Sequence, residues 1–262
     1  MGVLNVTPDS FSDAGRFLDL DRALAHARSM LADGADIIDI GGESTRPGAS
    51  PTSEADEIER IIPIVEALSR EGALISVDTM KPAVMRAAIA AGASMINDVR
   101  ALQEAGATDV VAKTDVAVCL MHMQGEPRTM QSAPVYRDVV ADVRDFLQAR
   151  VVACKSAGID ADRIAIDPGF GFGKTVAHNL RLMRELSTIA SLGFPVVLGA
   201  SRKSTLGKLT GRTADERLAA SIAAALAAVA HGASIVRVHD VRETLDALNV
   251  WRAIETGNEA TS

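Results

Sequence analysis

Short apolar segments alternate along this chain with longer segments in which apolar residues recur every three or four positions. The short segments predict β-strands, and the longer amphipathic segments predict α-helices. The expected strands are Gly2–Val6, Asp36–Ile40, Leu74–Val77, Ser94–Ile96, Val116–Met121, Ile164–Ile166, Pro195–Leu198 and Ile235–Val238. The expected helices lie near residues 19–33, 53–71, 82–91, 101–113, 135–157, 176–191, 213–231 and 240–255.

This alternation of eight strands with eight helices contains no pair of strands that resembles a hairpin. It therefore predicts the α/β class and, within it, a parallel (β/α)8 barrel of the TIM type. A doubly wound open sheet is the alternative. Because no linker rich in Pro or Ser divides the chain, one barrel domain is expected over residues 1–255, followed by a polar tail over residues 256–262.

Three segments share one layout, in which a helix-ending glycine leads into a strand and a polar residue follows five positions after that glycine. The three polar residues are Asp39, Asn97 and Arg237, so the layout places them near the carboxyl ends of three strands. Other strands also end in polar residues, which are Asn5, Asp78, His122, Asp167 and the run Ser201-Arg202-Lys203-Ser204. In a parallel barrel all of these ends meet at one mouth, which predicts a ligand site there.

The stretch from Asp167 to Thr175 has three glycines and a proline directly after an apolar strand, which indicates a loop with a specific backbone shape. It ends like a phosphate loop, but Pro168 occupies the position where that motif requires its first glycine. What remains is an acid, an aromatic face and a base on one loop, in Asp167, Phe172 and Lys174. These predict a pocket for a flat polar ring. A plain strand-to-helix turn is the alternative.

The net charge of −7 argues against general binding to nucleic acid or to anionic membranes. An anionic small molecule must therefore be met by local positive charge. The loops expected after the last two strands carry Arg202-Lys203 and Arg237-x-His239, at the place where such barrels often bind phosphate. Arg46 adds a further cation on the second loop. Together with the acids, these residues predict a polar heterocycle at the centre of the mouth and a phosphate at its rim.

Other features of the sequence limit the kinds of protein and of reaction that fit this chain. The two cysteines, Cys119 and Cys154, are too few for a disulfide framework and fit a reducing, cytoplasmic compartment. The longest apolar stretch is too short to span a bilayer. No His/Cys/carboxylate spacing indicates zinc, and no serine lies in a Gly-x-Ser-x-Gly motif. Asp240 and Glu243 predict a capping pair for the last helix. His122 is expected either to pack at the rim or to touch ligand.

The chain resembles the dihydropteroate synthase family, in the pterin-binding group of enzymes, from residue 2 to about residue 255. The resemblance rests on motifs in the family's order, which are Leu4-Asn5-Val6-Thr7-Pro8-Asp9-Ser10-Phe11-Ser12-Asp13, Gly41-Gly42-Glu43-Ser44-Thr45-Arg46-Pro47-Gly48, Asp78-Thr79, Asn97-Asp98, Asp167-Pro168-Gly169-Phe170-Gly171, Ser201-Arg202-Lys203-Ser204 and Arg237-Val238-His239. It implies a TIM-type barrel and a transferase. That transferase condenses 6-hydroxymethyl-7,8-dihydropterin diphosphate with 4-aminobenzoate, giving 7,8-dihydropteroate and diphosphate in folate biosynthesis.

The same resemblance implies roles for individual residues. The positions that match the pterin site are Asp78, Asn97, Met123, Asp167 and Lys203. The positions that match the diphosphate site are Asn5, Arg237 and His239, with Mg²⁺ between them and Asn5 as its protein ligand. The positions that match the aminobenzoate site are Thr45, Arg46, Pro47, Phe172, Lys203 and Ser204. Within these sets, the catalytic residues are expected to be Asp78, Asp167 and Lys203.

The charges favour a dissociative, magnesium-assisted loss of diphosphate, after which the aminobenzoate nitrogen attacks a cationic pterin intermediate. The resemblance also implies a sulfonamide target and a homodimer through late helices, with the Ala-rich segment from Ala219 as the candidate surface. The sequence departs from the family's usual pattern in two places. Ala14 replaces a glycine that is usual in the first loop, and the chain begins almost at its first strand.

Three rival classes are weighed against this interpretation. A corrinoid-dependent pterin methyltransferase shares the barrel and the ring pocket, but it would not need the cationic phosphate cluster. A nucleotide-binding switch or kinase would depend on Gly173-Lys174-Thr175, where Pro168 breaks the motif. A non-catalytic pterin-binding relative would be expected to lack site residues, and none is missing from this sequence.

Overall fold

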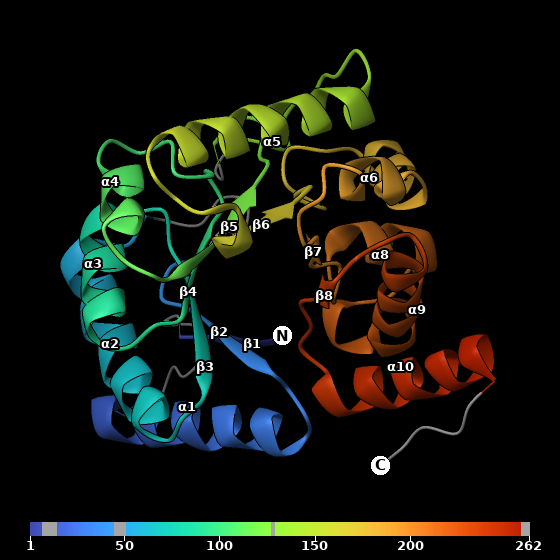
Figure 1. The fold of residues 1–262 in the computed structure, drawn as a ribbon. Helices are drawn as coiled ribbons and strands as arrows, with labels where there is room; N and C mark the ends of the chain where they lie inside the picture. Colours follow the sequence, from blue (N-terminus) through green and yellow to red (C-terminus); the bar gives the residue numbers. More distant parts are fainter. Residues whose placement is uncertain (7–14, 45–50, 127–128, 258–262) are drawn as a thin grey trace.

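The structure is a computed structural model that describes residues 1–6, 15–44, 51–126 and 129–257, and within these ranges helices surround eight parallel strands (Figure 1). Every strand expected from the sequence is present. The strands are β1 (Gly2–Asn5), β2 (Ile37–Gly41), β3 (Leu74–Asp78), β4 (Met95–Asp98), β5 (Ala117–Met121), β6 (Ile164–Asp167), β7 (Val197–Leu198) and β8 (Ile235–Val236).

The strands close into a circle. β1 to β6 form one parallel sheet in chain order, and β7 pairs with β8. Isolated bridges join the two sheets on both sides, because Ile166 pairs with Val196 and Gly2 pairs with Val238. At the second junction, Val3 N donates to Val238 O and Val238 N donates to Met1 O, each at 2.9 Å. The predicted TIM barrel is therefore confirmed, and the open-sheet alternative is wrong.

The helices follow the strands around the ring (Figure 1). The α-helices of the described residues are α1 (Gly15–Ala32), α2 (Glu54–Arg70), α3 (Pro82–Ala90), α4 (Ala107–Ala112), α5 (Val139–Ser156), α6 (Val176–Arg184), α7 (Leu186–Ala190), α8 (Ser204–Thr210), α9 (Leu218–Ala230) and α10 (Val241–Thr256). Two short 3-10 turns lie at Ala161–Arg163 and Ala214–Glu216. In the part of the chain that the structure describes, no helix has the length and apolar character needed to cross a membrane.

Several helices differ from the sequence prediction, and α9, for example, begins at Leu218 rather than near residue 213. The helix expected near 101–113 begins only at Ala107, because the Asp98 carboxylate accepts from Arg100 N at 2.8 Å and Leu102 N at 2.7 Å and holds a turn there. The helix expected near 176–191 is divided at Glu185 into α6 and α7. The short helix α8 was not expected, since glycines interrupt its apolar pattern.

Alternate residues of each strand face opposite sides of the barrel wall. One set, such as Ile38 and Ile40 of β2, packs against the helices in the large core. The other set points into the barrel. There an apolar plug is formed by Met1, Met95, Cys119, Ala165 and Val197. This plug fills the amino-terminal end of the barrel and leaves the carboxyl ends of the strands for the site.

Candidate active site

The carboxyl ends of the strands bring the predicted polar residues to one mouth. Asn5, Asp78 and Asp167 are the last residues of β1, β3 and β6. In the strand register Asn5 pairs with Gly41, Gly41 with Asp78, and Asp78 with Asn97. Because side chains alternate along a strand, each of these polar residues lies on the inner face, above the plug. The convergence that the sequence predicted is therefore present.

Arg237 joins the acids at the centre of this mouth. Its Nε donates to Asp39 Oδ2 at 2.6 Å, and its Nη2 donates to Asp78 Oδ2 at 3.1 Å. Asn97 Nδ2 donates to the same Asp39 oxygen at 3.3 Å. The three residues of the shared strand layout are thus in direct contact. Asp39 was absent from the predicted ligand sites, although its place in that layout beside Asn97 and Arg237 was the signal for it.

Burial controls the ionisation of this cluster. It raises the pKa of Asp78 to about 7, a shift that Arg237 opposes and the nearby Asp39 reinforces. Burial also lowers the pKa of Arg237, but the attraction of Asp39 and Asp78 outweighs it, so the net pKa is raised. The guanidinium therefore stays charged. The carboxyl of Asp78 is poised between its two forms near neutral pH.

Two acceptors in the cluster lack a donor. Asp39 Oδ1 and Asn97 Oδ1 are buried and have no hydrogen-bond partner among the described residues. Leaving a buried polar atom unpaired costs about 1–3 kcal/mol. Both atoms have less than 1 Å² of exposed surface, so a ligand with N–H groups would pair with them only after these side chains turn toward the mouth.

Across the mouth, Asp167 faces Lys203 and the glycine-rich loop. Burial raises the pKa of Asp167, and the Lys203 charge opposes that shift. Burial lowers the pKa of Lys203 to about 8, against the attraction of Asp167. The Lys203 ammonium lies 4.5 Å from the centroid of the Phe172 ring and donates to the carbonyl of Phe170. Asp167, the Phe172 ring and the base Lys203 therefore lie together at this side of the mouth, whereas the base predicted for the loop pocket was Lys174.

Lys174 does not belong to that pocket, so one prediction is wrong. Its side chain is 3% exposed. Its Nζ contacts His122 Nδ1 at 3.0 Å and donates to the carbonyls of Gly169 at 3.0 Å and Phe172 at 2.9 Å. The base that faces Asp167 from the ligand side is Lys203. His122 is buried with Lys174, and its ring packs edge-on against Phe146 at 4.9 Å. Of the two roles considered for His122, the structure shows packing.

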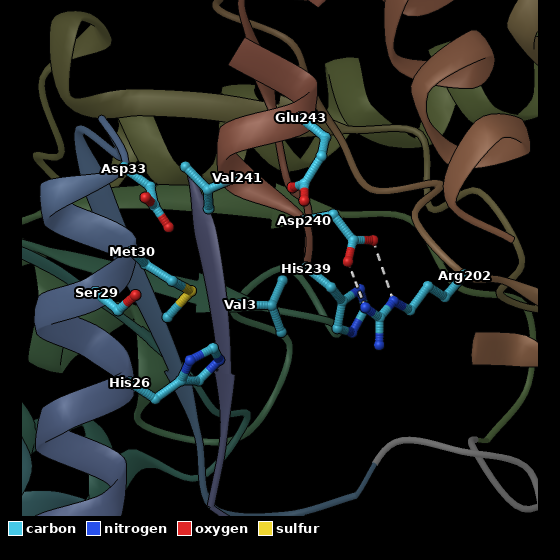
Figure 2. Close-up of a pocket in the computed structure, with 10 residues that line it drawn as sticks. All are labelled: Val3, His26, Ser29, Met30, Asp33, Arg202, His239, Asp240, Val241 and Glu243. Carbon is cyan, nitrogen blue, oxygen red and sulfur yellow. Dashed lines mark hydrogen bonds and ion pairs between the residues drawn. The ribbon is translucent and has the colours of Figure 1, made fainter. Parts of the chain in front are cut away.

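The cationic rim also differs from the prediction. Arg202 Nε donates to Asp240 at 3.1 Å, and its Nη2 makes a second contact with the same carboxylate (Figure 2). The expected capping pair is wrong, because Asp240 precedes α10 without a side-chain capping bond and pairs with Arg202 instead. His239 lies beside this pair, and its Nδ1 is 3.0 Å from Ser201 Oγ. Arg202 is therefore engaged by Asp240, while Arg237 contacts the acids inside the barrel and His239 contacts Ser201.

A cavity of about 270 Å³ lies on the outer side of this rim, between α1 and the start of α10 (Figure 2). Among the described residues that were predicted to bind ligand, His239 and Arg202 line it. The charged lining is mixed, with Arg202 and three acids, which are Asp33, Asp240 and Glu243. The cavity is therefore separate from the ring of acids inside the barrel.

Some predicted residues lie elsewhere. Thr45, Arg46, Pro47, Ala14 and the first loop beyond Val6 lie outside the described residues. Met123 is half-buried just after β5, next to His122. Ser204 is exposed and is the first residue of α8, directly after Lys203.

The residues around Asn5 suit a magnesium ion. The described part of the chain has no cluster of three or more His, Cys, Asp or Glu side chains able to hold a metal by themselves. However, a Cβ placed on Gly41 would lie 3.9 Å from Asn5 Oδ1 and 4.0 Å from Asp78 Oδ2. Asp78 Oδ2 already accepts from Arg237 Nη2 at 3.1 Å, so Asn5 Oδ1 is the oxygen of this pair that would hold an ion. Magnesium takes oxygen ligands and keeps several waters and substrate phosphate oxygens, so this donor set fits it.

Comparison with known proteins identifies the group to which this barrel belongs. The model of the family "Pterin binding enzyme" matches residues 1–239. The chain belongs to this family of pterin-binding enzymes.

Named relatives within the family are more specific. The dihydropteroate synthase of Haemophilus influenzae is 52% identical over 254 residues, covering 97% of this chain and 92% of the relative. A Xanthomonas albilineans dihydropteroate synthase solved with 4-aminobenzoic acid is 50% identical with a TM-score of 0.92, covering 100% of this chain and 93% of that one. A structure of the enzyme from the same organism in complex with 7,8-dihydropteroate is 48% identical with a TM-score of 0.89, at the same coverage. The resemblance inferred from the motifs is confirmed.

Proposed function

We propose that this chain catalyses the dihydropteroate synthase reaction, in which 6-hydroxymethyl-7,8-dihydropterin diphosphate and 4-aminobenzoate give 7,8-dihydropteroate and diphosphate. It is a transferase of folate biosynthesis. The observation that carries this proposal is the pair of unpartnered buried acceptors, Asp39 Oδ1 and Asn97 Oδ1, beside the acids Asp78 and Asp167. A pterin ring presents the N–H and amino groups that such acceptors require.

The acidic floor of the mouth holds the pterin. Asp78, Asn97 and Asp167 accept from the ring's N–H groups, while Lys203 donates to an acceptor of the ring and Met123 packs nearby. A site built from buried hydrogen-bonding groups rejects rings that lack the matching groups, because its own polar atoms would then stay unpaired. Asp78 and Asp167 lie on opposite sides of the barrel interior, which suits a flat ring between them.

The diphosphate lies toward Arg237 and His239, with Asn5 on the adjacent strand end. Asn5 would hold Mg²⁺ through its amide oxygen. When bound, that ion neutralises part of the diphosphate charge. Arg237 is already fixed by Asp39 and Asp78, so its guanidinium is held in place before substrate arrives. The diphosphate then leaves a site whose cations are preorganised.

Aminobenzoate binds on the other side of Lys203. The Phe172 ring forms one wall, Lys203 lies 4.5 Å above it, and Ser204 begins the adjacent helix α8. Thr45, Arg46 and Pro47 of the second loop complete the set predicted from the sequence.

The mechanism is dissociative. The carbon–oxygen bond to the diphosphate breaks first, and the positive charge that develops on the dihydropterin is stabilised by the carboxylates of Asp78 and Asp167. The amino nitrogen of aminobenzoate then attacks the methylene carbon and afterwards loses a proton to solvent. Lys203 touches both substrates, so it orients the nucleophile against the pterin.

Two further features belong to this proposal. The chain forms a homodimer in which α9 (Leu218–Ala230), with its run of alanines, lies at the interface. A monomeric mass in light scattering would contradict this. The protein functions in the cytoplasm, consistent with two buried free cysteines, Cys119 and Cys154.

The decisive experiment is to measure diphosphate release after mixing the purified chain with the pterin diphosphate, aminobenzoate and Mg²⁺. Release that requires both substrates, together with formation of dihydropteroate, is the expected result. Diphosphate release that is unaffected by aminobenzoate, with no dihydropteroate formed, would overturn the proposal.

A further inference from the structure

The glycine-rich loop between β6 and α6 is held almost entirely by side chains. Its five consecutive carbonyls, from residue 169 to residue 173, lie outside any strand or helix, and each accepts a hydrogen bond from a side chain. The donors are Lys174 for Gly169 and Phe172, Lys203 for Phe170, Gln131 for Gly171 and Tyr136 for Gly173. Lys174 alone therefore serves two of the five carbonyls.

The surroundings of Lys174 Nζ fit an ammonium. Four acceptors lie within hydrogen-bonding distance of it, since the carbonyl of His122 at 3.3 Å joins His122 Nδ1, Gly169 O and Phe172 O. A charged lysine offers three N–H donors and no acceptor. A neutral amine would turn its lone pair toward an oxygen. Burial lowers the pKa of Lys174 to about 7, while these acceptors favour its charged form. All of its hydrogen bonds go to the backbone and side chain of two loops.

The loop has two distinct sides. A Cβ on Gly169, where φ is +69°, would lie 1.9 Å from His122 O, so this side of the loop is pressed against the chain after β5. A Cβ on Gly171 would lie 3.0 Å from Lys203 Cδ, so that side faces the ligand pocket. Lys174 therefore contacts the side of the loop that faces the chain after β5, and Lys203 contacts the opposite side, which faces the ligand site.

We propose that Lys174 is a positioning residue for the aminobenzoate pocket, which it shapes by fixing the carbonyls of Gly169 and Phe172 against the chain after β5. The Phe172 ring is then held 4.5 Å from Lys203 Nζ. Lys174 touches neither substrate. The assignment rests on the proposed function, because it concerns the same pocket.

Lys174→Met tests this assignment, because its unbranched side chain is only one atom shorter and it removes every donor. The KM for aminobenzoate is expected to rise roughly 10- to 100-fold, which corresponds to the loss of hydrogen bonds from a charged group. The affinity for the pterin diphosphate, measured by calorimetry, is expected to change much less because Asp167 remains on β6. Equal loss of affinity for both substrates would indicate general damage and overturn the assignment.

Two matched controls calibrate the effect. Lys155→Met removes an exposed lysine from α5 and should leave both constants unchanged. Tyr136→Phe removes one neutral hydrogen bond from the same loop, to Gly173 O at 2.8 Å, and should raise the KM for aminobenzoate only about threefold. An effect of Tyr136→Phe as large as that of Lys174→Met would contradict the special role of Lys174.

A double-mutant cycle with Phe172→Leu shows whether Lys174 acts through that ring. If it does, adding Lys174→Met to Phe172→Leu should raise KM little further, whereas additive losses would overturn the assignment.

Lys174→Gln keeps two donors, so it should retain most of the affinity and still fold if the Met variant does not. A Gln variant whose affinity for aminobenzoate is as impaired as that of the Met variant would also contradict the positioning role of Lys174. The unaltered chain must release diphosphate in the same assay, which separates a failure of the proposed function from a failure of this assignment.

Discussion

The two layers of the barrel interior differ in chemistry although the same strands build them. In the lower layer, Met95 and Ala165 belong to the apolar plug, with Ile37 and Ile235 packed against it. Two residues further along the same strands, the upper layer holds Asp39, Asn97, Asp167 and Arg237. The lower layer can only contribute packing, whereas the upper layer concentrates charge that burial makes costly.

This contrast shows how a small apolar plug can support a charged site. A buried carboxylate destabilises the fold unless it is paired, and here Arg237 pairs with Asp39 at 2.6 Å and with Asp78 at 3.1 Å. The plug below contains no charged side chain, and the one charged group among its residues, the Met1 ammonium, donates to Val236 O at 3.0 Å. Substitutions in the two layers should therefore have separable effects, on stability in one case and on substrate binding in the other.

The largest expected effect is in the upper layer. In the proposed complex, Asp167→Asn and Lys203→Ala each remove a charged partner of the bound substrate, which typically costs about 2–5 kcal/mol and so reduces turnover about 30- to 5,000-fold. Diphosphate release should fall toward background while the circular dichroism spectrum stays unchanged. Near-normal turnover in either purified variant would refute its place in the site.

The next effect is in the lower layer. Met95→Ala should lower the free energy of unfolding by about 2–5 kcal/mol, because it leaves a cavity in the plug. Both KM values should stay within error, as denaturant titration and steady-state kinetics would show. The matched variant Asn97→Ala, two residues along β4, should weaken pterin binding instead. If Met95→Ala altered substrate affinity as strongly as Asn97→Ala, the layers would not be independent.

Raising the pH should affect activity and stability in opposite directions. Burial lowers the pKa of Lys203 to about 8 from its ordinary 10.5, so turnover should decline as pH rises through 8 and the ammonium is lost. In the unfolded chain this lysine keeps its proton up to its ordinary pKa. The folded state therefore binds fewer protons between these values, and the contribution of Lys203 to stability rises across that window. A turnover profile that stayed flat well above pH 8 would contradict the role of Lys203.

The smallest effect is expected at the rim. Arg202 was predicted to help bind phosphate, but its guanidinium pairs with Asp240 and is partly exposed. Arg202→Ala should change stability by less than about 1 kcal/mol. It should raise the KM for pterin diphosphate far less than Arg237→Ala does in the same assay. Equal losses of affinity for pterin diphosphate in the two variants would support the original prediction that Arg202 helps to bind phosphate.

The sequence predicted most of the fold because strand and helix periodicity differ so clearly in this chain. It did not predict α8, since Gly207 and Gly211 break the apolar pattern of so short a helix. It also extended α4 by six residues at its start. Ala101 and Leu102 adopt left-handed backbone conformations, where the Asp98 carboxylate accepts from Leu102 N and the Arg150 guanidinium, from α5, donates to the carbonyls of both residues. Interactions of one side chain with a distant backbone leave no periodic signal.

Part of the site could likewise be predicted from the sequence. Strand ends in a parallel barrel must converge, so residues such as Asp78 and Arg237 could be grouped from position alone. Which way a loop side chain turns could not be derived in that way. Lys174 and Lys203 both lie near Phe172 and Asp167, and only the packing of Gly169 against His122 O shows that Lys174 lies behind the loop.

The alternation along β4 has a consequence for how this barrel tolerates change. Asn97 points into the mouth, and its neighbour Asp98 points outward, where it holds the turn before α4. Inserting or deleting a single residue ahead of this pair would exchange the two side chains across the wall, so the ligand pocket would lose its amide at the same time as the turn lost its anchor. In strands such as this one, the register is therefore constrained as strictly as the identity of each residue.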